Sequence, residues 1–578
     1  MEESWEPNGA RTGASARRSA PPRIMIQRKK KIVLYQPKQV DDSLGAESCK
    51  DMLPLEMLTI AAYPIADGYD VQIVDGSLYT GTAGHDALLE ACDGAMMVAT
   101  TGILGYMVTD GYLAMRKVKG RFPSLPAVIG GWFASVRPDL QLETGMYECV
   151  VHGQGEIAFR EVVQAIDHGT PLDDVPGLAL PRDGKTVYTA HRDVVGFDKL
   201  ERVPWELLEY DRYVDLQLKP SYNQKVRHRF PLPGHWTPEN PPKGFSMFSS
   251  FGCPEPCTFC CSPLVTGRRW KAIPGKQLAE EVAELHQRFG FDVLRFQDAN
   301  FGVAEKRTRE FCETLVDLDV PIHWNGTIEI ETIMRYKKET LDLLEDSKCH
   351  LLWLGAETGT KDMQDRIKKF IDIENIPKAI GELVNRNITP GAFWIIGYPG
   401  ETQESMEATL KQAARVKHLY PLCGSDVYPF RPIPGTEDFR QAVELGYQAP
   451  QSFEEWGGCF EYKYNSQNTE LPEAVRHTWQ RYNNTAAIYD MHVQEGPLWM
   501  RKLLSKIAGE RLKRGVYDFP IEQKLFDLYV RMTGQTQRGD HVSQEYAQLQ
   551  PETHARLVEE AREGGLHRLL EHALTAPG

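Results

Sequence analysis

The chain has 578 residues, of which 42% are hydrophobic and 25% charged, a composition that excludes a wholly disordered or fibrous protein and predicts several globular domains. Its formal net charge of −14 disfavours general binding to nucleic acids or to anionic membranes. No run of about 18 apolar residues occurs, so we expect no membrane-spanning helix. The 11 cysteines are too few for a disulfide scaffold, and we expect a cytoplasmic protein with reduced thiols.

The N-terminal part predicts a tail followed by an α/β domain. Residues 1–30 are rich in Gly, Ser, Pro and Arg, and we expect them to form a disordered basic tail. Over residues 31–170 short apolar runs alternate with helical stretches, the first of which spans about 53–66. The expected strands are Ile32–Tyr35, Val71–Asp75, Ala95–Ala99, Ala127–Gly131 and Cys149–Val151. Apolar strands separated by crossover helices predict a doubly wound, Rossmann-like parallel sheet.

Small residues gather where three of these strands end. In open α/β sheets ligands bind beyond the carboxyl ends of the strands, and glycine lets the backbone approach a bulky ligand closely. One such turn alone would be an ordinary tight turn, whereas three at one edge favour a ligand site. Its candidate residues are Thr100, Thr101, Gly130, Gly131, Gly153, Gly155 and Glu156.

A second α/β series follows a proline-rich segment. We interpret residues 171–243 as an extended linker. Over residues 244–445 the expected strands are Phe245–Ser249, Val293–Phe296, Pro321–Trp324, Leu351–Leu354, Phe393–Ile396 and Asp426–Phe430. Helical stretches lie between them, so six strand–helix units predict a partial (β/α)6 barrel with its chemistry at the C-terminal strand ends. Residues 446–578 are expected to form a separate helical region, with aromatic residues concentrated at its start.

The strongest chemical signal is a cysteine motif directly after the first barrel strand. Cys253, Cys257 and Cys260 have the spacing C-x3-C-x2-C. Three thiolates on a tight loop suit an iron–sulfur cluster and would leave one iron of a four-iron cluster open. A structural zinc normally takes four protein ligands, and Cys261 adjoins Cys260 too closely to serve as a fourth. Zinc and a disulfide remain the alternatives, and Cys261 is expected to be a buried thiol.

This motif, with Phe259 before its last cysteine, resembles the radical S-adenosylmethionine (SAM) superfamily. Segments at later strand ends are similar to the same family: Phe296–Phe301, Gly355–Gly359, Ile396–Thr402 and Arg431–Thr436. The first α/β domain resembles the cobalamin-binding domain that precedes such barrels. The resemblance covers roughly residues 31–440.

The resemblance implies three cofactors and a set of residues for them. Cys253, Cys257 and Cys260 would hold a [4Fe–4S] cluster, and SAM would chelate the open iron. The residues closest to SAM would be Phe259, Asp298, Asn300 and Glu357, and the strand-end set of the first domain would bind cobalamin. Structural roles, as a turn former for Asp298 and a helix N-terminal carboxylate for Glu357, are the alternatives. The candidate catalytic residues are Glu329 and Tyr428.

Two features depart from the family pattern. Glu329 stands where related barrels often carry an arginine, so a cation that could pair with the SAM carboxylate is missing there. Glu329 is expected to be a solvated carboxylate, or else to approach the cluster or accept a proton. No Asp-x-His-x-x-Gly motif supplies a histidine to cobalt, and His85 is expected to lie on the surface. A weak or absent lower cobalt ligand would fit methyl transfer.

The resulting prediction is a cobalamin-dependent radical SAM methyltransferase. It would move a methyl group from SAM, by way of methylcobalamin, to an unactivated carbon of a natural product, peptide or metabolite. The alternatives are an oxidative cyclase or ring-rearranging enzyme without methyl transfer, and a non-catalytic cobalamin or cluster sensor. A methylthiotransferase is less favoured because the first domain lacks a second cysteine triplet. The expected partners are a substrate and a low-potential flavodoxin- or ferredoxin-type electron donor, with no nucleic acid.

Overall fold

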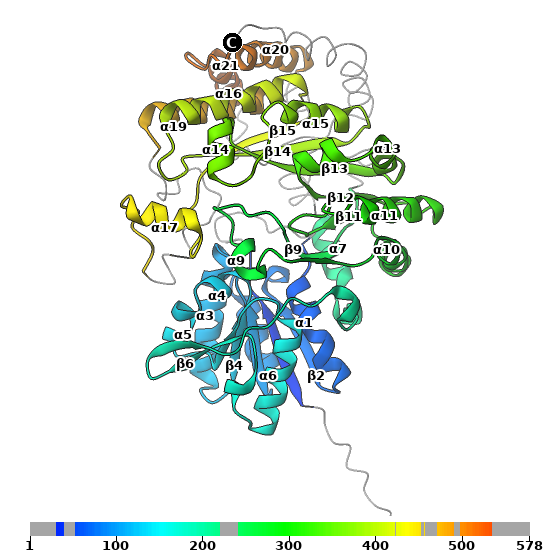
Figure 1. Ribbon diagram of the computed structural model, residues 1–578, viewed down its shortest axis with the longest axis vertical. Coiled ribbons are helices and arrows are strands. Elements are labelled where there is room, and N and C mark those ends of the chain that lie inside the picture. The colour runs from blue at the N-terminus through cyan, green and yellow to red at the C-terminus, as the bar shows by residue number, and fades with distance from the viewer. Residues whose placement is uncertain are drawn as a thin grey trace, which may run out of the picture.

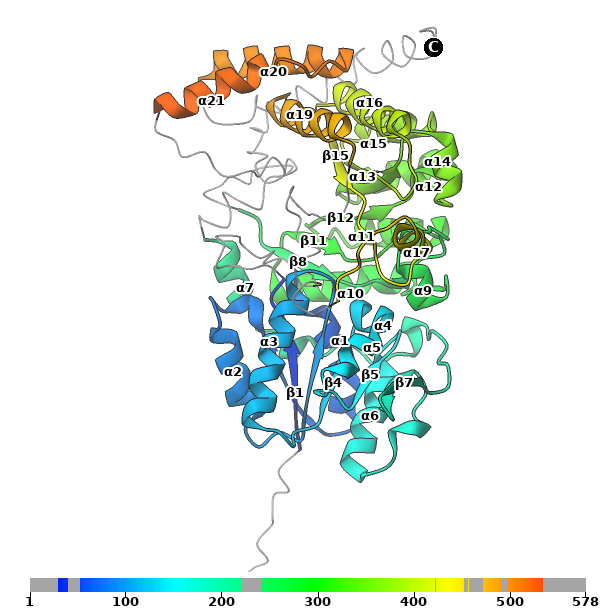
Figure 2. The same ribbon diagram turned by 90° about the vertical axis from the view of Figure 1, so that its left-hand side faces the viewer.

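The computed structural model describes residues 30–39, 52–219, 241–421, 423–451, 456, 471–489 and 497–533. The described elements form two α/β lobes stacked along the long axis of the molecule (Figure 1). The N-terminal lobe lies at one end, the second lobe occupies the middle, and helices from the C-terminal part cover the far end (Figures 1 and 2). The expected tail, except for Lys30, lies outside the described residues.

The N-terminal lobe contains a seven-stranded sheet of order β2-β1-β3-β4-β5-β6-β7. Its strands are β1 (Lys31–Gln36), β2 (Asp70–Asp75), β3 (Met97–Thr101), β4 (Ala127–Gly130), β5 (Cys149–Val151), β6 (Leu178–Arg182) and β7 (Lys185–Tyr188). Its helices are α1 (Leu55–Ala66), α2 (Ala83–Cys92), α3 (Tyr106–Arg121), α4 (Trp132–Val136), α5 (Pro138–Glu143) and α6 (Glu156–His168). The first five strands are parallel, as the sequence predicts for a doubly wound sheet.

Side chains of β1 show why the sheet is covered on both faces. Ile32 and Leu34 belong to the hydrophobic cluster that includes α1 and α6, whereas Val33 and Tyr35 belong to the cluster that includes α2 and α3. All four are fully buried. A strand with two apolar faces needs helices on both sides, and the crossover helices supply them.

The segment expected to be an extended linker is partly folded onto the first lobe. β6 pairs antiparallel with β5, and β7 pairs antiparallel with β6, so the sheet continues to Tyr188 rather than ending near residue 170. Helix α7 (Tyr210–Gln217) follows, and its Tyr213 hydroxyl donates a hydrogen bond to Asp75 Oδ2 at 2.5 Å. The linker prediction is therefore wrong for these parts, whereas residues 220–240 lie outside the described residues.

The second lobe is a parallel sheet of six strands in the order β15-β14-β13-β12-β11-β8. Its strands are β8 (Gly244–Met247), β11 (Val293–Phe296), β12 (His323–Ile328), β13 (Cys349–Glu357), β14 (Thr389–Ile396) and β15 (Gly424–Pro429). The intervening helices are α10 (Gly275–Phe289), α11 (Glu305–Asp317), α12 (Ile330–Arg335), α13 (Lys338–Asp346), α14 (Lys361–Arg366), α15 (Asn375–Val384) and α16 (Gln403–Leu419). Each new strand is added beside the previous one, and β8 and β15 form the two edges. The predicted partial (β/α)6 barrel is confirmed.

Alternation along the barrel strands separates a core side from an inner side. In β13, Leu352 and Leu354 are buried in the large hydrophobic cluster, whereas Trp353 between them is only half-buried. In β14, Ala392 and Trp394 are buried in that cluster, whereas Phe393 is half-buried and stacks on Trp353 with ring centroids 4.9 Å apart. This period of two is that of a strand with its outer face under helices.

Three helices of the C-terminal part are described: α19 (Glu473–Tyr489), α20 (Leu498–Arg514) and α21 (Ile521–Thr533). The Trp479 indole donates to Val427 O at 2.8 Å, and the Tyr482 hydroxyl donates to Ser425 O at 2.6 Å. Both rings therefore fix α19 on β15 as part of the core. Among the other aromatic residues of this region, Trp456 is buried beside Phe133, and residues 460–464 lie outside the described part.

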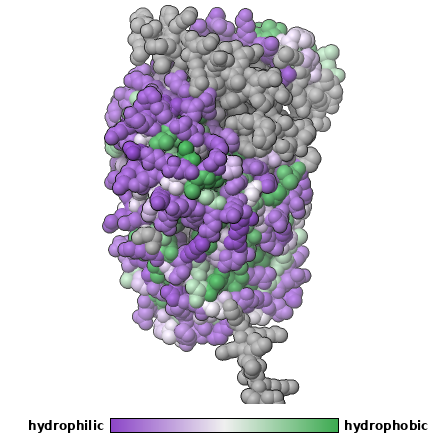
Figure 3. Space-filling view, turned by 90° about the vertical axis from the view of Figure 1, so that its right-hand side faces the viewer, coloured by the Kyte–Doolittle hydropathy of each residue, from purple (hydrophilic) through white to green (hydrophobic). Residues whose placement is uncertain are grey.

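The described surface shows no sign of a membrane-spanning segment. None of the described helices is long and apolar enough to cross a bilayer. The face shown in Figure 3 is mostly hydrophilic, with hydrophobic residues in small separate patches. That pattern is ordinary for the surface of a folded domain.

One buried histidine in the barrel gives a testable pH dependence. Burial, with a smaller effect of His323, lowers the pKa of His350 from 6.5 to about 3. The unfolded chain therefore binds a proton between these values that the folded chain does not bind, and stability falls as the pH drops below 6.5. We expect His350→Gln to reduce the loss of unfolding free energy between pH 7 and 5.5 by about 1 kcal/mol. Denaturant titrations at the two pH values measure this, and equal losses in both proteins would contradict it.

Candidate functional site

A pocket lies between the two lobes, at the edge of the first sheet that faces the barrel. All seven strand-end residues predicted from the sequence line it: Thr100, Thr101, Gly130, Gly131, Gly153, Gly155 and Glu156. Its opposite wall comes from the barrel and includes Phe248, Ser250, Phe251, Gln297 and Ala299. The carboxyl ends of β3, β4 and β5 thus meet the start of the barrel around one space, as expected for an open parallel sheet.

At Gly131 the backbone of the pocket floor approaches Thr101 and Gly102 too closely for a side chain. Its φ of +93° is in the left-handed region, and a Cβ there would lie 2.4 Å from Thr101 Oγ1 and 3.0 Å from the backbone of Gly102. Any larger residue would therefore strain the backbone and push the two strand ends apart. Trp132, the next residue, stacks on Phe251 of the opposite wall with ring centroids 6.4 Å apart.

Polar atoms without a protein partner face an otherwise largely apolar pocket. Glu156 Oε2, Ser250 Oγ and Gln297 Nε2 all belong to pocket-lining residues, and none has a hydrogen-bond partner among the described atoms. Burial raises the pKa of Glu156, which favours its neutral form. Buried polar groups are normally satisfied, so these three atoms indicate a ligand with donors and acceptors around an apolar body.

The cysteine loop follows a short hairpin at the barrel mouth, formed by β9 (Ser250–Gly252) and β10 (Trp270–Ala272). Helix α9 (Ser262–Thr266) begins just after the last cysteine, and its Ser262 N–H donates to Cys260 Sγ at 3.4 Å. Burial raises the pKa of Cys253 to about 11 and that of Cys257 further. An iron–sulfur cluster binds thiolates. The attraction of the positive irons must therefore offset the free-energy cost of deprotonating these buried thiols.

The three cysteines lie near one another but are not arranged around a single ion. Among the described residues, no group of three or more His, Cys, Asp or Glu side chains is placed to hold a single metal ion. Ligands of a [4Fe–4S] cluster bind separate irons and need not converge on one point. Cys253, Cys257 and Cys260 lie near enough to one another for the charge of Cys260 to raise the pKa of the other two further.

A buried cation that the sequence did not reveal lies beside the cysteines. Lys369 Nζ is 2.8 Å from Glu329 Oε2 and 3.4 Å from Glu357 Oε1. All three side chains are at least 86% buried, so the expectation of a solvated Glu329 is wrong. The charge of Lys369 lowers the pKa of Cys257 against the dominant effect of burial, which shows that the ammonium group is close to the cysteine loop.

The backbone around this ion-pair cluster is strained. Glu357 has φ of +62°, and Lys368 and Phe370, which flank Lys369, have φ of +56° and +59°. Non-glycine residues in this conformation cost free energy and gather at functional sites. Burial raises the pKa of Glu357, whereas the two carboxylates outweigh burial and raise the pKa of Lys369. Lys369 is therefore charged, and its single ammonium group lies close to both carboxylates, those of Glu329 and Glu357.

The remaining predicted residues have different surroundings. Asp298 accepts from the backbone N–H groups of Ser249 and Ser250, at 2.7 and 3.1 Å, and from the Ser249 hydroxyl at 2.5 Å. Its oxygens therefore already hold the start of the hairpin. Asn300 is 1% exposed and its Oδ1 has no partner among the described atoms, which leaves an acceptor for a ligand. Phe259 packs against Tyr398, with ring centroids 5.7 Å apart.

Tyr428 lies on β15, on the inner side of the barrel. Its ring lies 6.1 Å from that of Phe393, so it belongs to the same aromatic row as Trp353. Glu329, the other candidate catalytic residue, lies directly before α12 and pairs with Lys369.

His85 is buried rather than on the surface, contrary to expectation. It lies in α2, is 3% exposed, and its Nε2 is 2.9 Å from Asp110 Oδ1. The other oxygen of Asp110 accepts from the Tyr35 hydroxyl at 2.7 Å and from the Lys38 N–H at 2.9 Å. None of the described residues that line the pocket is a histidine. His85 is thus part of the packing between β1, α2 and α3.

Comparisons with known proteins agree with this arrangement. The model of the radical SAM superfamily matches residues 247–413, which include the cysteine loop and most of the barrel. An uncharacterized methyltransferase, PH0819, from Pyrococcus horikoshii is 25% identical over 392 residues, or 68% of this chain and 78% of that protein. An anaerobic magnesium-protoporphyrin IX monomethyl ester cyclase from Rubrivivax gelatinosus is 26% identical over 64% of this chain and 63% of that protein.

A solved structure shares the fold across both lobes. TsrM from Kitasatospora setae, a radical SAM methyltransferase with cobalamin and a [4Fe–4S] cluster bound, matches 88% of this chain and 100% of its own chain. The TM-score is 0.57 at 14% sequence identity. Radical SAM domains use a [4Fe–4S] cluster and SAM, which fits the cysteine loop. The barrel of this chain therefore contains a radical SAM domain, which covers residues 247–413.

Proposed function

We propose that this chain is a cobalamin-dependent radical SAM methyltransferase that moves a methyl group from SAM to a carbon atom of a small-molecule or peptide substrate. The observation that carries the proposal is the pocket between the lobes, which joins the strand ends of the first sheet to the mouth of the barrel. The methyltransferase names of PH0819 and TsrM support it. TsrM binds both cobalamin and a cluster, so one chain with this fold accommodates both.

The residues of the pocket fit a corrin. A corrin is a broad ring with an apolar rim and amide side chains, and it needs a flat floor with scattered polar partners. Gly130 and Gly131 would provide the floor, and Glu156, Ser250 and Gln297 present the unpartnered polar atoms. Cobalamin would supply a cobalt centre that accepts and donates a methyl group. No histidine is among the described residues that line the pocket.

The barrel mouth fits SAM and the cluster. Cys253, Cys257 and Cys260 would hold three irons, and the cluster would supply the electron that cleaves SAM. The roles of this chain are to bind SAM, to orient it and to exclude water. Asn300 Oδ1 offers a buried acceptor that suits an ammonium or hydroxyl group of SAM.

Lys369 is the residue that we expect to bind the SAM carboxylate. It would supply the positive charge that is absent at position 329, and Glu329 and Glu357 would hold it in place. We expect Lys369→Met to weaken SAM binding by about tenfold to a hundredfold, because a charge-assisted hydrogen bond to a carboxylate is lost. Isothermal titration of the reconstituted protein with SAM, and the change that SAM produces in the spectrum of the reduced cluster, measure this.

A matched variant separates the charge from the packing. Lys369→Arg keeps the charge and should retain most of the SAM response, whereas Lys361→Met removes an exposed lysine paired with Asp365 and should have no effect. If Lys369→Met bound SAM as the unmodified protein does, the assignment would be wrong.

The decisive experiment for the proposal is a metal and product analysis. The protein would be produced with cobalamin and purified without oxygen, and iron and cobalt would be measured per chain. About four irons and one cobalt are expected. SAM with a deuterated methyl group would then be supplied with a low-potential donor of the flavodoxin or ferredoxin type. Label in a product together with S-adenosylhomocysteine supports methyl transfer, whereas iron without cobalt would overturn the proposal.

A second candidate function rests on one comparison. The cyclase from Rubrivivax gelatinosus matches a share of this chain similar to that of PH0819. An oxidative cyclase would consume SAM to 5′-deoxyadenosine and form a product without the methyl label. A non-catalytic sensor would hold both metals and form neither product, so the same labelled assay distinguishes the three.

A further inference from the structure

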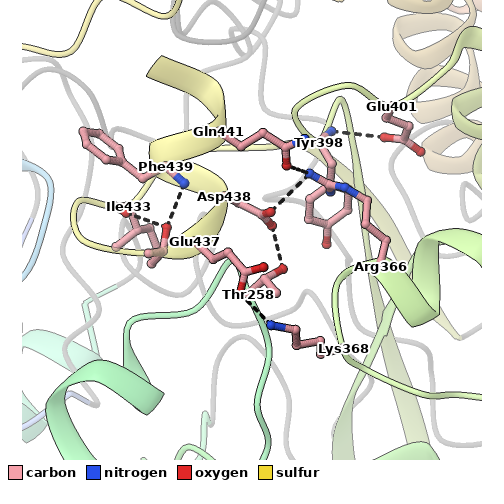
Figure 4. A network of polar contacts seen from close by, with 11 residues as sticks. Thr258, Arg366, Lys368, Tyr398, Glu401, Ile433, Glu437, Asp438, Phe439 and Gln441 are labelled. Atoms are coloured by element: carbon pink, nitrogen blue, oxygen red, sulfur yellow. Dashed lines mark hydrogen bonds and ion pairs between the residues drawn. The ribbon is translucent and has the colours of Figure 1, made fainter. Parts of the chain in front are cut away.

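Helix α17 (Glu437–Glu444) is joined to the cysteine loop by a reciprocal pair of hydrogen bonds, of which Figure 4 shows the one between side chains. The Thr258 hydroxyl donates to Asp438 Oδ2 at 2.9 Å, and the Asp438 N–H donates to Thr258 O at 3.2 Å. Thr258 lies between Cys257 and Cys260 in the sequence. The backbone and side chain of one cluster-loop residue are thus both held by one residue of α17.

Asp438 is itself fixed by charge and by the start of its helix. Arg366, at the end of α14, donates through Nη2 to Asp438 Oδ1 at 3.2 Å. Thr436 caps α17 by accepting from the Phe439 N–H at 3.0 Å, which places Asp438 in the first helical turn, where a carboxylate is favoured. Asp438 is 2% exposed. A carboxylate this deeply buried is costly to unpair, so its geometry is strongly fixed.

The cysteine loop is also held from a second direction. The Thr258 N–H donates to Ile367 O at 3.1 Å, directly after α14, and Arg366 in that helix also bonds the side chain of Gln441 in α17 (Figure 4). The loop that carries Lys369 follows immediately. All hydrogen-bonding groups of Thr258 that the structure pairs therefore bond either to α17 or to the end of α14.

We propose that Asp438 is a positioning residue for the cluster: held by Arg366, it keeps Thr258 in place and thereby fixes the spacing of Cys257 and Cys260. This inference rests on the cluster of the proposed function, not on cobalamin or methyl transfer. Asp438 also places a negative charge beside the loop. Because reduction adds an electron to the cluster, a nearby carboxylate disfavours it, and charge and hydrogen bonding around a cluster set its potential.

The test uses Asp438→Asn in the full chain reconstituted with iron and sulfide. The amide keeps the size of the side chain, but it loses the charge and cannot accept from both Thr258 and Arg366. We expect a higher midpoint potential of the cluster, an altered spectrum of its reduced form and faster loss of iron to a chelator. A purely structural helix contact would not move the potential or the spectrum of a fully loaded cluster.

Glu437→Gln is the matched control. Glu437 is the neighbouring residue on α17, forms an ion pair with Lys368 at 2.7 Å, and is 54% exposed, so its loss removes the same charge without touching Thr258. It should leave the potential and iron retention unchanged. If Asp438→Asn behaved like Glu437→Gln, the proposal would be overturned.

Thr258→Val provides an independent route if Asp438→Asn does not fold. It removes only the hydroxyl that donates to Asp438 and keeps the shape of the side chain. We expect faster iron loss, and an effect that does not add to that of Asp438→Asn, since the two residues act through one contact. Iron retention equal to that of the unmodified protein would contradict the proposal. A protein that never takes up iron, even unmodified, would instead contradict the proposed function.

Discussion

Replacing Cys257 with alanine is expected to abolish SAM cleavage and to remove most of the iron from the protein. Cys257 is 8% exposed and lies in the middle of the C-x3-C-x2-C loop. Two remaining thiolates cannot hold three irons of a four-iron cluster. Iron analysis and the yields of 5′-deoxyadenosine and methionine, measured on anaerobically reconstituted protein, test this.

Cys261 provides the control, because it adjoins Cys260 but is not expected to bind iron. Cys261→Ala should retain iron and SAM cleavage close to those of the unmodified protein. The same result is expected for alanine at Cys312, a buried thiol in α11. Full SAM turnover in Cys253→Ala, Cys257→Ala and Cys260→Ala variants would show that the cysteines do not hold the catalytic cluster.

The fold could be predicted where hydrophobic patterning was strong. Strands buried on both faces, such as β1, read as continuous apolar runs, and β11 matches its predicted bounds of Val293–Phe296. The predicted strand bounds agreed less well with the structure where polar residues face the inside of the barrel. β12 spans His323–Ile328, and its Asn325 and Thr327 have the composition of a loop although they form a strand. Apolar periodicity does not reveal strands whose inner face is polar.

The amino-acid composition of residues 171–188 gave no sign that this segment extends the first sheet. Three of the four residues of β7 are exposed, as expected for an edge strand that meets water. Such a strand has no hydrophobic alternation to detect. Prolines later in the segment suggested a linker, but Tyr213 of α7 bonds to Asp75 in the first lobe. A tertiary hydrogen bond of this kind leaves no local signal.

The residues of the candidate site could be predicted in the first lobe, whereas the prediction for the second lobe was incomplete. The glycine turns of the first domain could be found because parallel strands end at a common edge, which the topology alone dictates. Lys369 could not be found, because it belongs to a loop 40 residues beyond Glu329 and reaches it only through the strained backbone around Lys368 and Phe370. The sequence indicated a missing cation, and the fold supplies one from another element.

The polar contacts around the cysteine loop connect these observations. Asp298 holds the hairpin before the loop, Asp438 holds Thr258 within it, and Lys369 lies beside it with two carboxylates. Each of these groups is buried and hydrogen-bonded or ion-paired, which is costly unless the geometry is fixed. Elements that follow three different strands thus surround one short loop, and one of them bonds to it directly. A cluster that must present one open iron to SAM in a defined orientation requires such support.

Filling the floor of the interlobe pocket is expected to abolish cobalamin binding. In Gly131→Ala the new Cβ would lie 2.4 Å from Thr101 Oγ1, in a backbone conformation that alanine adopts only at a cost. The ends of β3 and β4 would have to separate, and the flat surface under the corrin would be lost. We expect no cobalt in the purified protein, whereas iron content and the cluster spectrum should be unchanged. Cobalt analysis and the visible absorption of the corrin measure this.

Two further variants separate a filled pocket from a strained backbone. Gly155 also lines the pocket, but its Cβ would meet only ordinary contacts at 3.6 and 3.8 Å, so Gly155→Leu should fold and still exclude the corrin through its bulk. Gly102 has open space around its Cβ and does not line the pocket, so Gly102→Ala should bind cobalamin normally. Retention of cobalt in Gly155→Leu, together with a folded first lobe by circular dichroism, would place cobalamin elsewhere. Because the cysteine loop lies in the other lobe, loss of cobalt with retained iron would show that the two cofactors bind independently.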